Sequence, residues 1–397
     1  MLQHKLQDID QQLIDLIGKR ILLLTKLEHI CLDEQVSNYT LSIAQAGVPE
    51  SIWKNFVTNC AAAVCTLSLP AEKVQPQRIT IIGGRGMMGR FFTQRLSAAG
   101  HKVTILEQGD WGQAESLLAG ADLVLVCVPI EFTVDVIRQV TQYLAPTTAL
   151  ADIASIKAPI VPAMLEHHNG PVMGLHPMFG PGVKSFLSQN VVVCPGREDK
   201  AFQWLLNLIE NEGGRLIVCE PEEHDQMMVV IQAIRNFVTF GFGVFLAEQD
   251  IDVRRCLDLS SPIFRLEFGL VSRLLTQSAP LIVDIMLATQ ERREAICRLV
   301  KTCDRLAQLV SNKDREALIH EFKVAYCSLG GEINPTKEES TYVIDALSTF
   351  LAAREVEQGH SSTARKQSKT FHNLQLKSEK QTSSSLNPRQ NSATKNQ

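Results

Sequence analysis

The chain has 397 residues, of which 45% are hydrophobic and 21% are charged, and its formal net charge is −4. These values are ordinary for a globular protein of two or three domains, and they give no electrostatic reason to expect a nucleic acid or an anionic membrane as partner. Ten cysteines are scattered without a CxxC pair or a metal-binding cluster, which predicts reduced thiols in a cytoplasmic protein without a bound metal. The polar N-terminus and the charge-interrupted apolar stretches predict neither a signal peptide nor a membrane span.

Two helices are predicted in the N-terminal segment, residues 1–75. Apolar residues recur at alternating steps of three and four over residues 1–35, which predicts a single helix there. Arg20 falls on this apolar face, where a hydrophobic residue is expected. A second helix is predicted through Ile52 and Phe56, and the prolines beyond it mark a linker.

An α/β Rossmann-type domain is predicted over residues 78–222. Continuous apolar runs that alternate with helices indicate a parallel sheet covered on both faces. The predicted strands, in chain order, are RITIIGG, KVTILE, ADLVLVCVP, ALADIAS, GPVMGLH, NVVVCPG and GRLIVCE. Residues 223–355 carry long helical patterns and predict an all-α domain. Residues 356–397 are poor in large apolar side chains, so we expect a disordered tail.

A glycine-rich turn follows the first predicted strand. Gly84, Gly86 and Gly89 fit the pattern G-x-G-x-x-G between a strand and a helix, which is the context that dinucleotide binding requires. The first glycine makes the tight turn, the second lets the backbone approach a pyrophosphate, and the third permits close helix–strand packing. The helix N-terminus then faces the phosphates. The alternative is a glycine turn in an ordinary βαβ unit.

The end of the second predicted strand indicates which dinucleotide binds. Glu107 lies there, and a carboxylate at that place accepts hydrogen bonds from ribose hydroxyls and repels a 2′-phosphate, which favours NAD over NADP. Arg85 is the counter-argument, because an arginine can bind a 2′-phosphate. The expected cofactor-binding residues are Gly84, Gly86, Met87, Met88, Gly89, Glu107, Val128 and Pro129.

A histidine and a serine follow neighbouring predicted strands. His176 lies in GLHPMFGP, where prolines and glycines hold it on a rigid, irregular backbone of the kind that presents side chains to a cleft. Ser155 lies in DIASIK, and the carboxyl ends of such strands line the ligand crevice. Ser155 can hydrogen-bond one imidazole nitrogen and leave the other for a substrate hydroxyl. The alternatives are a structural turn histidine and a serine that caps a helix.

The helical region supplies cations. Arg265 and Arg273 lie eight residues apart on neighbouring faces of one predicted helix. An arginine on an apolar helix either pairs with an internal carboxylate or binds an anionic ligand, and both interpretations stay open here. On an earlier helix, the spacing predicts a common face for four residues: His224, Met228, Ile231 and Arg235.

Together these motifs resemble the prephenate dehydrogenase family, in particular the dehydrogenase portion of the bifunctional chorismate mutase/prephenate dehydrogenases of bacterial tyrosine biosynthesis. The similarity covers residues 78–350 and includes IIGGRGMMGR, ILEQGDW, VCVPI, DIASIK, GLHPMFGP, EHDQMM, IQAIRNF and LSSPIFRLE. The resemblance implies NAD-dependent oxidative decarboxylation of prephenate to 4-hydroxyphenylpyruvate, with release of CO₂ and NADH. It also implies a homodimer formed by the helical domain.

The resemblance further implies roles for single residues. His176 is the base that removes the proton of the C4 hydroxyl, and Ser155 assists that hydroxyl and orients His176. Arg273 binds a prephenate carboxylate, while Lys157 and Arg265 line or support the site.

Two features depart from the family pattern. Asn236 stands where similar enzymes often carry a histidine near the substrate or inhibitor. An amide donates a hydrogen bond but does not become cationic, so this position does not support the family's carboxylate affinity or its feedback control by tyrosine. Residues 1–75 resemble a helical chorismate mutase domain that retains Arg20 but has Gln3 and Cys31 in place of an arginine and a lysine. We expect a degenerate mutase that serves dimer packing.

Three other functions are compatible with these residues. The first is an enzyme that keeps both activities, and the second is an arogenate dehydrogenase, whose substrate has an amino group in place of the side-chain keto group. The third is a non-catalytic dinucleotide sensor on the same fold. Intact His176, Ser155 and Arg273 favour an enzyme, because a sensor needs no base beside the hydride.

Overall fold

The computed structural model describes residues 1–67, 75–180 and 182–357. The tail predicted over residues 356–397 therefore lies outside the described residues from residue 358 onward. By contacts the chain divides into two compact units. One is Met1–Cys256 with Glu267–Phe322, and the other is Leu257–Leu266 with the chain from Lys323 onward. The whole sheet and the helix that directly follows it belong to the first unit.

The sheet has seven strands, and each predicted strand is present. They are β1 (Arg78–Ile82), β2 (Lys102–Leu106), β3 (Leu123–Val126), β4 (Ala149–Asp152), β5 (Val172–Pro177), β6 (Asn190–Arg197) and β7 (Arg215–Val218). Their order is β2-β1-β3-β4-β5-β6-β7. The prediction of a wholly parallel sheet is wrong at one pair, since β6 runs antiparallel to β5. The described residues between these two strands form no helix, whereas a parallel crossover usually contains one.

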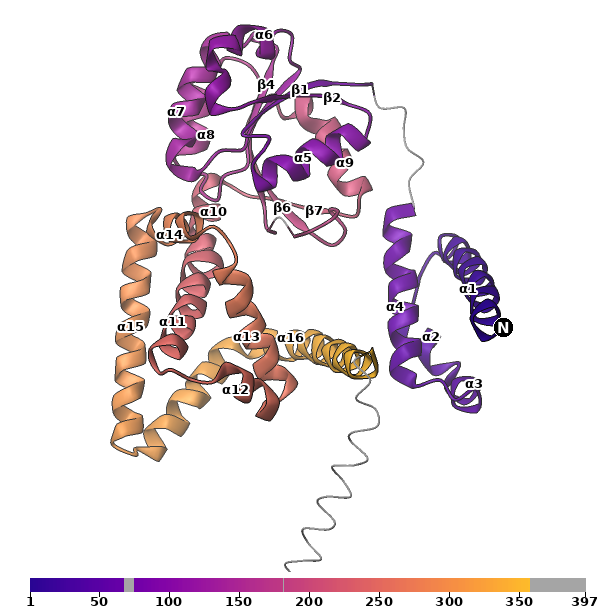
Figure 1. Cartoon of the computed structure of the whole chain (residues 1–397). Helices are drawn as coiled ribbons and strands as arrows, with labels where there is room; N and C mark the ends of the chain where they lie inside the picture. The colour runs from indigo at the N-terminus through magenta and orange to yellow at the C-terminus, as the bar shows by residue number, and fades with distance from the viewer. Residues whose placement is uncertain (68–74, 181, 358–397) are drawn as a thin grey trace, which may run out of the picture. The chain divides into compact units, whose positions relative to one another are not determined.

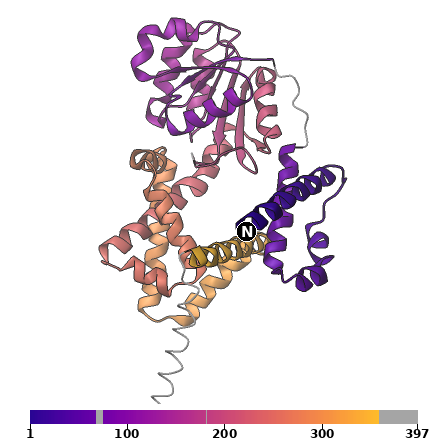
Figure 2. The ribbon, with the colours of Figure 1, turned by 45° about the vertical axis from the view of Figure 1, so that its right-hand side comes forward.

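Helices cover both faces of this sheet (Figures 1 and 2). One face packs against α5 (Met87–Ala98) and α9 (Gln203–Asn211) through Phe92 and Leu205, among others. The other face packs against α6 (Ala114–Leu118), α7 (Ile130–Val140) and α8 (Ile160–His167). All four residues of β3 are buried, as expected for a continuous apolar strand in a doubly covered sheet. Short 3₁₀ segments complete the domain at Gln108–Gln113, Thr141–Tyr143 and Asp199–Phe202.

The predicted all-α region is confirmed. Its elements are α10 (Pro221–Met228), η4 (Val229–Ile234), α11 (Arg235–Glu248), α12 (Val253–Leu259), α13 (Pro262–Leu275), α14 (Ala279–Leu287), α15 (Gln290–Ser311) and α16 (Arg315–Glu357). The first three form one continuous helical stretch in which η4 is π-helical. A π segment inserts an extra residue into the turn and rotates the faces that follow it. The predicted common face is therefore wrong: His224 and Met228 are buried, but Ile231 is 50% exposed and Arg235 is exposed.

By length and composition alone, the stretch Pro221–Glu248 is apolar enough to cross a membrane, and α13 with α14 passes the same test only as a pair bent by 97°. However, His224, Asp225 and Gln232 on the first stretch hydrogen-bond to residues of the sheet domain. A lipid phase offers no such partners, so these contacts favour a helix of a globular domain over a membrane span.

The described part of the N-terminal segment, residues 1–67, contains four helices, namely α1 (Leu2–Leu24), α2 (Leu32–Ser37), α3 (Thr40–Gln45) and α4 (Glu50–Leu67). The predicted single helix over residues 1–35 is wrong, because α1 ends at Leu24. There the Thr25 hydroxyl donates to the carbonyl oxygen of Leu22 at 2.9 Å, and such local bonds compete with the helical ladder. The second predicted helix is confirmed by α4, which contacts α1 and α2.

Candidate active site

The turn between β1 and α5 has no room for a side chain at Gly84 or Gly89. A Cβ on Gly89 would lie 2.2 Å from the carbonyl oxygen of Gly83, and a Cβ on Gly84 would lie 2.8 Å from Ile105. Gly86 is exposed and precedes α5 without a side-chain cap, so the first N–H groups of that helix are available to an anion. This backbone cradle fits the pyrophosphate of a dinucleotide, as the glycine spacing predicted.

Glu107 lies beside this turn. Its Oε1 accepts a hydrogen bond of 2.7 Å from the main-chain N–H of Arg85, and Asp110 caps the N–H of Glu107 at 2.9 Å. The carboxylate is thereby held at the carboxyl end of β2, where a ribose is expected. Val128 also lies at the turn, since its Cγ1 would be 3.3 Å from a Cβ on Gly83, and Pro129 directly precedes α7. These residues fit the adenosine side of NAD.

The His176 imidazole is buried at the carboxyl end of β5. Its Nδ1 lies 2.8 Å from Nε2 of His224, and its Nε2 lies 3.2 Å from Nε2 of Gln232. Burial lowers its pKa well below the usual histidine value, and the nearby Lys157, His224 and Arg292 lower it further. His176 is therefore neutral at pH 7 and can accept a proton.

Ser155 is placed differently from the prediction. Its hydroxyl is buried and has no hydrogen-bond partner among the described residues, so it does not hold the imidazole of His176. It is not a helix cap either, because α8 begins after Pro159 and has no side-chain cap. The imidazole of His176 is instead positioned by its hydrogen bond with His224, on α10.

Lys157 pairs with Asp152 inside the protein. Both side chains have 0% exposure, and the Lys157 ammonium donates a short hydrogen bond to Oδ2 of Asp152, the last residue of β4. The main-chain N–H of Lys157 donates to Oδ1 of Asp225 at 2.8 Å. Lys157 thus supports the site structurally, because its charge is paired with Asp152 and its main-chain N–H holds Asp225.

Arg292 was not predicted from the sequence. It comes from α15 and is fully buried, and it donates to the carbonyl oxygens of Ile285 and Ser155, both at 2.9 Å. Its Nε is buried without a partner in the described part of the chain. Burial lowers the pKa of Arg292, and the negative charge of Asp225 partly offsets this. A single arginine in a charged helix such as QERREAICRLV carries no sequence signal for this role.

The remaining predicted polar residues lie on the helices. Arg273 is exposed, and its guanidinium makes no hydrogen bond or ion pair with any described residue, so the internal-pair interpretation is not supported. Arg265 donates to the carbonyl oxygen of Leu257 at 2.6 Å. Asn236 is buried, and its Oδ1 accepts a 3.2 Å hydrogen bond from the guanidinium of Arg235. Within residues 1–67, 75–180 and 182–357 there is no cluster of side chains that could hold a metal ion.

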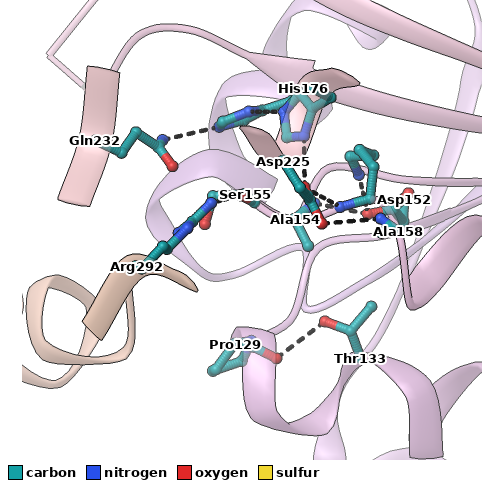
Figure 3. A network of polar contacts seen from close by, with 12 residues as sticks. Pro129, Thr133, Asp152, Ala154, Ser155, Ala158, His176, Asp225, Gln232 and Arg292 are labelled. Carbon is teal, nitrogen blue, oxygen red and sulfur yellow. Dashed lines mark hydrogen bonds and ion pairs between the residues drawn. The ribbon is translucent and has the colours of Figure 1, made fainter. Parts of the chain in front are cut away.

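Figure 3 shows how these groups meet: two imidazole rings stand in a row between Gln232 and Asp225, with Ser155 and Arg292 nearby. A glycine cradle at the first βα turn, together with a neutral, buried imidazole at a strand end of the same sheet, fits the class of nicotinamide-dependent dehydrogenases.

Comparison with known proteins makes this class specific. Residues 97–218 match the nucleotide-binding domain of prephenate dehydrogenase, and residues 220–324 match its dimerization domain. The chain is 34% identical over 337 residues to the T-protein of Haemophilus influenzae, covering 81% of this chain and 89% of that protein. It is 36% identical over 344 residues to the T-protein of Enterobacter agglomerans, covering 81% and 90%. The chain therefore belongs to the prephenate dehydrogenase family and is an NAD-dependent dehydrogenase.

The fold agrees with this assignment. The crystal structure of prephenate dehydrogenase from Aquifex aeolicus, in complex with hydroxyphenyl propionate and NAD⁺, superposes with a TM-score of 0.52 at 18% identity. The match covers 66% of this chain and 100% of the Aquifex chain.

Proposed function

We propose that this enzyme oxidises prephenate to 4-hydroxyphenylpyruvate with His176 as the base. The observation that carries the proposal is a neutral imidazole at a strand end of the dinucleotide-binding sheet, with one nitrogen held by His224 and the other directed toward Gln232. NAD, when bound, supplies a nicotinamide ring that accepts hydride.

The protein residues then carry the proton. His176 takes the proton of the C4 hydroxyl through Nε2 while hydride leaves C4, so the oxygen becomes a carbonyl. Breaking the bond between the ring and its carboxylate releases CO₂, and the electrons of that bond complete the aromatic ring. The proton on His176 returns to the phenolate oxygen, which leaves the base neutral again. Before substrate binds, the amide of Gln232 donates a hydrogen bond to the lone pair of Nε2. The substrate hydroxyl must therefore replace this amide as the donor to Nε2.

Arg273 is the proposed anchor for a substrate carboxylate. Replacing it with alanine removes a charge-assisted interaction of about 1.5–3 kcal/mol, so KM for prephenate is expected to rise about 10- to 150-fold with a smaller change in kcat. Steady-state kinetics measures both values. Arg298→Ala, a change at another exposed arginine of the helical region, is the matched control and is expected to leave KM unchanged. An unaltered KM in Arg273→Ala would show that another cation, and not Arg273, binds the substrate carboxylate.

The lowered pKa of His176 predicts the pH dependence. The base must be neutral, and its folded pKa lies below the usual value of about 6.5, so the protein must reach a lower pH before the base is protonated. The acidic limb of kcat/KM is therefore expected below pH 6.5. A limb at or above that pH would contradict the assigned environment of the base. The measurement is kcat/KM over pH 4.5–8 in buffers of constant ionic strength.

The substrate is tested by NADH formation with prephenate, arogenate and chorismate supplied separately. We expect turnover with prephenate, and none with chorismate because the mutase-like segment is degenerate. In that segment Arg20 hydrogen-bonds Gln35, and its guanidinium lies over the rings of Trp53 and Phe56, at 5.9 and 5.4 Å. Chorismate-dependent NADH would reveal an active mutase and therefore both activities. Faster turnover of arogenate would assign the other substrate.

We further propose a homodimer formed through the helical region, in a cytoplasmic protein. The family model of this region is a dimerization domain, and α11 exposes large apolar side chains such as Val238, Phe240 and Phe245. A second copy of the chain would bury them. The described cysteines are free, which fits a reducing compartment. Tyrosine is the candidate inhibitor of this site.

A further inference from the structure

We infer that His224 and Asp225 act with His176 as a hydrogen-bonded relay, in which Asp225 selects the tautomer of both rings and balances the charge that His176 acquires. The inference rests on the proposed role of His176 as the base. In this arrangement His224 and Asp225 are positioning residues, because they reach the substrate only through His176.

The geometry consists of two consecutive short contacts. Oδ1 of Asp225 lies 2.7 Å from Nδ1 of His224, and Nε2 of His224 lies 2.8 Å from Nδ1 of His176. The two rings are 5.0 Å apart between centroids and inclined at 70° (Figure 3). Both distances are those of good hydrogen bonds.

These contacts determine where the protons lie. A carboxylate only accepts hydrogen bonds, so Nδ1 of His224 must donate to Asp225. In the neutral ring, Nε2 of His224 is then an acceptor, and Nδ1 of His176 must donate to it. Nε2 of His176 is left with a lone pair, and this is the nitrogen that meets the amide N–H of Gln232. The chain of donors thus presents the basic nitrogen of His176 on the side of Gln232.

Asp225 is itself held firmly. Its Oδ1 also accepts from the main-chain N–H of Lys157 at 2.8 Å, and its Oδ2 accepts from that of Ala158 at 3.0 Å. Burial would raise the pKa of Asp225, but the hydrogen bonds from His224 and from these two main-chain groups lower it below the usual value. Asp225 is therefore an ionised carboxylate anchored to the loop that also carries Ser155.

The charges around His176 show why a second carboxylate is needed. Two cations, Lys157 and Arg292, lie near His176. Of the two carboxylates, Asp152 pairs with Lys157 and Asp225 lies beyond His224. Because Asp152 neutralises Lys157, a proton taken up by His176 would add a second buried positive charge to that of Arg292, in a site of low polarity. Asp225 is the remaining carboxylate that can offset these charges. Its negative charge polarises the His224 ring, and the effect reaches His176 through that ring.

The test compares two replacements of His224 in the full-length enzyme. His224→Gln can still accept a hydrogen bond from Nδ1 of His176, whereas His224→Leu cannot. We expect kcat to fall about 10²–10³-fold in His224→Leu and about tenfold in His224→Gln, with KM for prephenate within roughly threefold of the wild-type value. We also expect the acidic limb of kcat/KM to move to lower pH by about one unit in His224→Leu only, because the protonated ring loses its acceptor.

Asp225→Asn provides a second measurement that keeps the size of the side chain. Its amide cannot accept from all three donors at once, so the tautomer of His224 is no longer imposed, and kcat is expected to fall about 10²–10⁴-fold. The matched control is Asp122→Asn, which makes the same change at a carboxylate that also accepts a main-chain N–H, from Arg78 at 2.7 Å. Thermal unfolding and NAD affinity, measured for every variant, report on folding.

The outcomes separate the relay from the base. Equal kcat and equal pH profiles for His224→Leu and His224→Gln would overturn the relay, as would wild-type kcat in Asp225→Asn. If His224→Leu does not fold, Asp225→Asn alone decides, and a loss of kcat without a change in KM supports the relay. If His176→Asn is active, the proposed base fails; if it is inactive while the His224 and Asp225 variants match the wild type, only the relay fails.

Discussion

His176→Asn is expected to lower kcat about 10²–10⁴-fold while the affinity for NAD stays unchanged. The amide of asparagine can replace the donor that faces His224, so the local packing is kept. However, an amide does not accept a proton near neutral pH, so the C4 hydroxyl of the substrate keeps its proton. Single-turnover NADH formation measures the loss in the chemical step, and fluorescence titration measures NAD binding.

His167→Asn is the matched control for this variant. His167 is exposed on α8, and among the described residues its side chain makes one hydrogen bond, accepted at 3.4 Å from the guanidinium of Arg138. The control is expected to keep wild-type kcat. If His176→Asn retains more than about a tenth of wild-type kcat, the base is another group.

Lys157→Met is expected to destabilise the folded enzyme by about 3–5 kcal/mol. Lys157 and Asp152 are both fully buried, so removal of the ammonium leaves a carboxylate without solvent and without its countercharge. The free energy of unfolding, measured by urea titration, is the direct readout. Loss of activity in this variant would follow from loss of the loop that holds Asp225, since the main-chain N–H of Lys157 anchors that carboxylate.

A double variant tests the cause of this destabilisation. Asp152→Asn combined with Lys157→Met removes both charges, and its free energy of unfolding is expected to lie closer to wild type than that of Lys157→Met alone. If the double variant is as unstable as the single one, packing of the lysine side chain, and not its charge, supports the site.

The sequence predicted the parts of the site that depend on local patterns. The seven strands follow from short apolar runs between turns, and the cofactor cradle follows from the spacing of Gly84, Gly86 and Gly89. The position of Glu107 was also predictable, because it ends the second strand of a βαβ unit. His176 was singled out because prolines and glycines hold its backbone.

Other parts of the site required contacts between distant segments. His224 lies 48 residues from His176, and Arg292 lies 137 residues from Ser155, so no spacing rule relates either pair. The expected bond from Ser155 to His176 was reasonable from the strand ends alone. Instead, α10 brings a second imidazole to Nδ1 of His176.

By itself, the sequence determined which segments of residues 78–222 become strands and where the dinucleotide turn lies, because hydrophobic periodicity and glycine geometry act over a few residues. Only the tertiary structure decided that β6 runs antiparallel, that η4 turns Gln232 toward the base, and that Asp225 stands behind His224. These outcomes depend on which buried polar groups find partners once the helices pack against the sheet, and that pairing is a property of the whole fold.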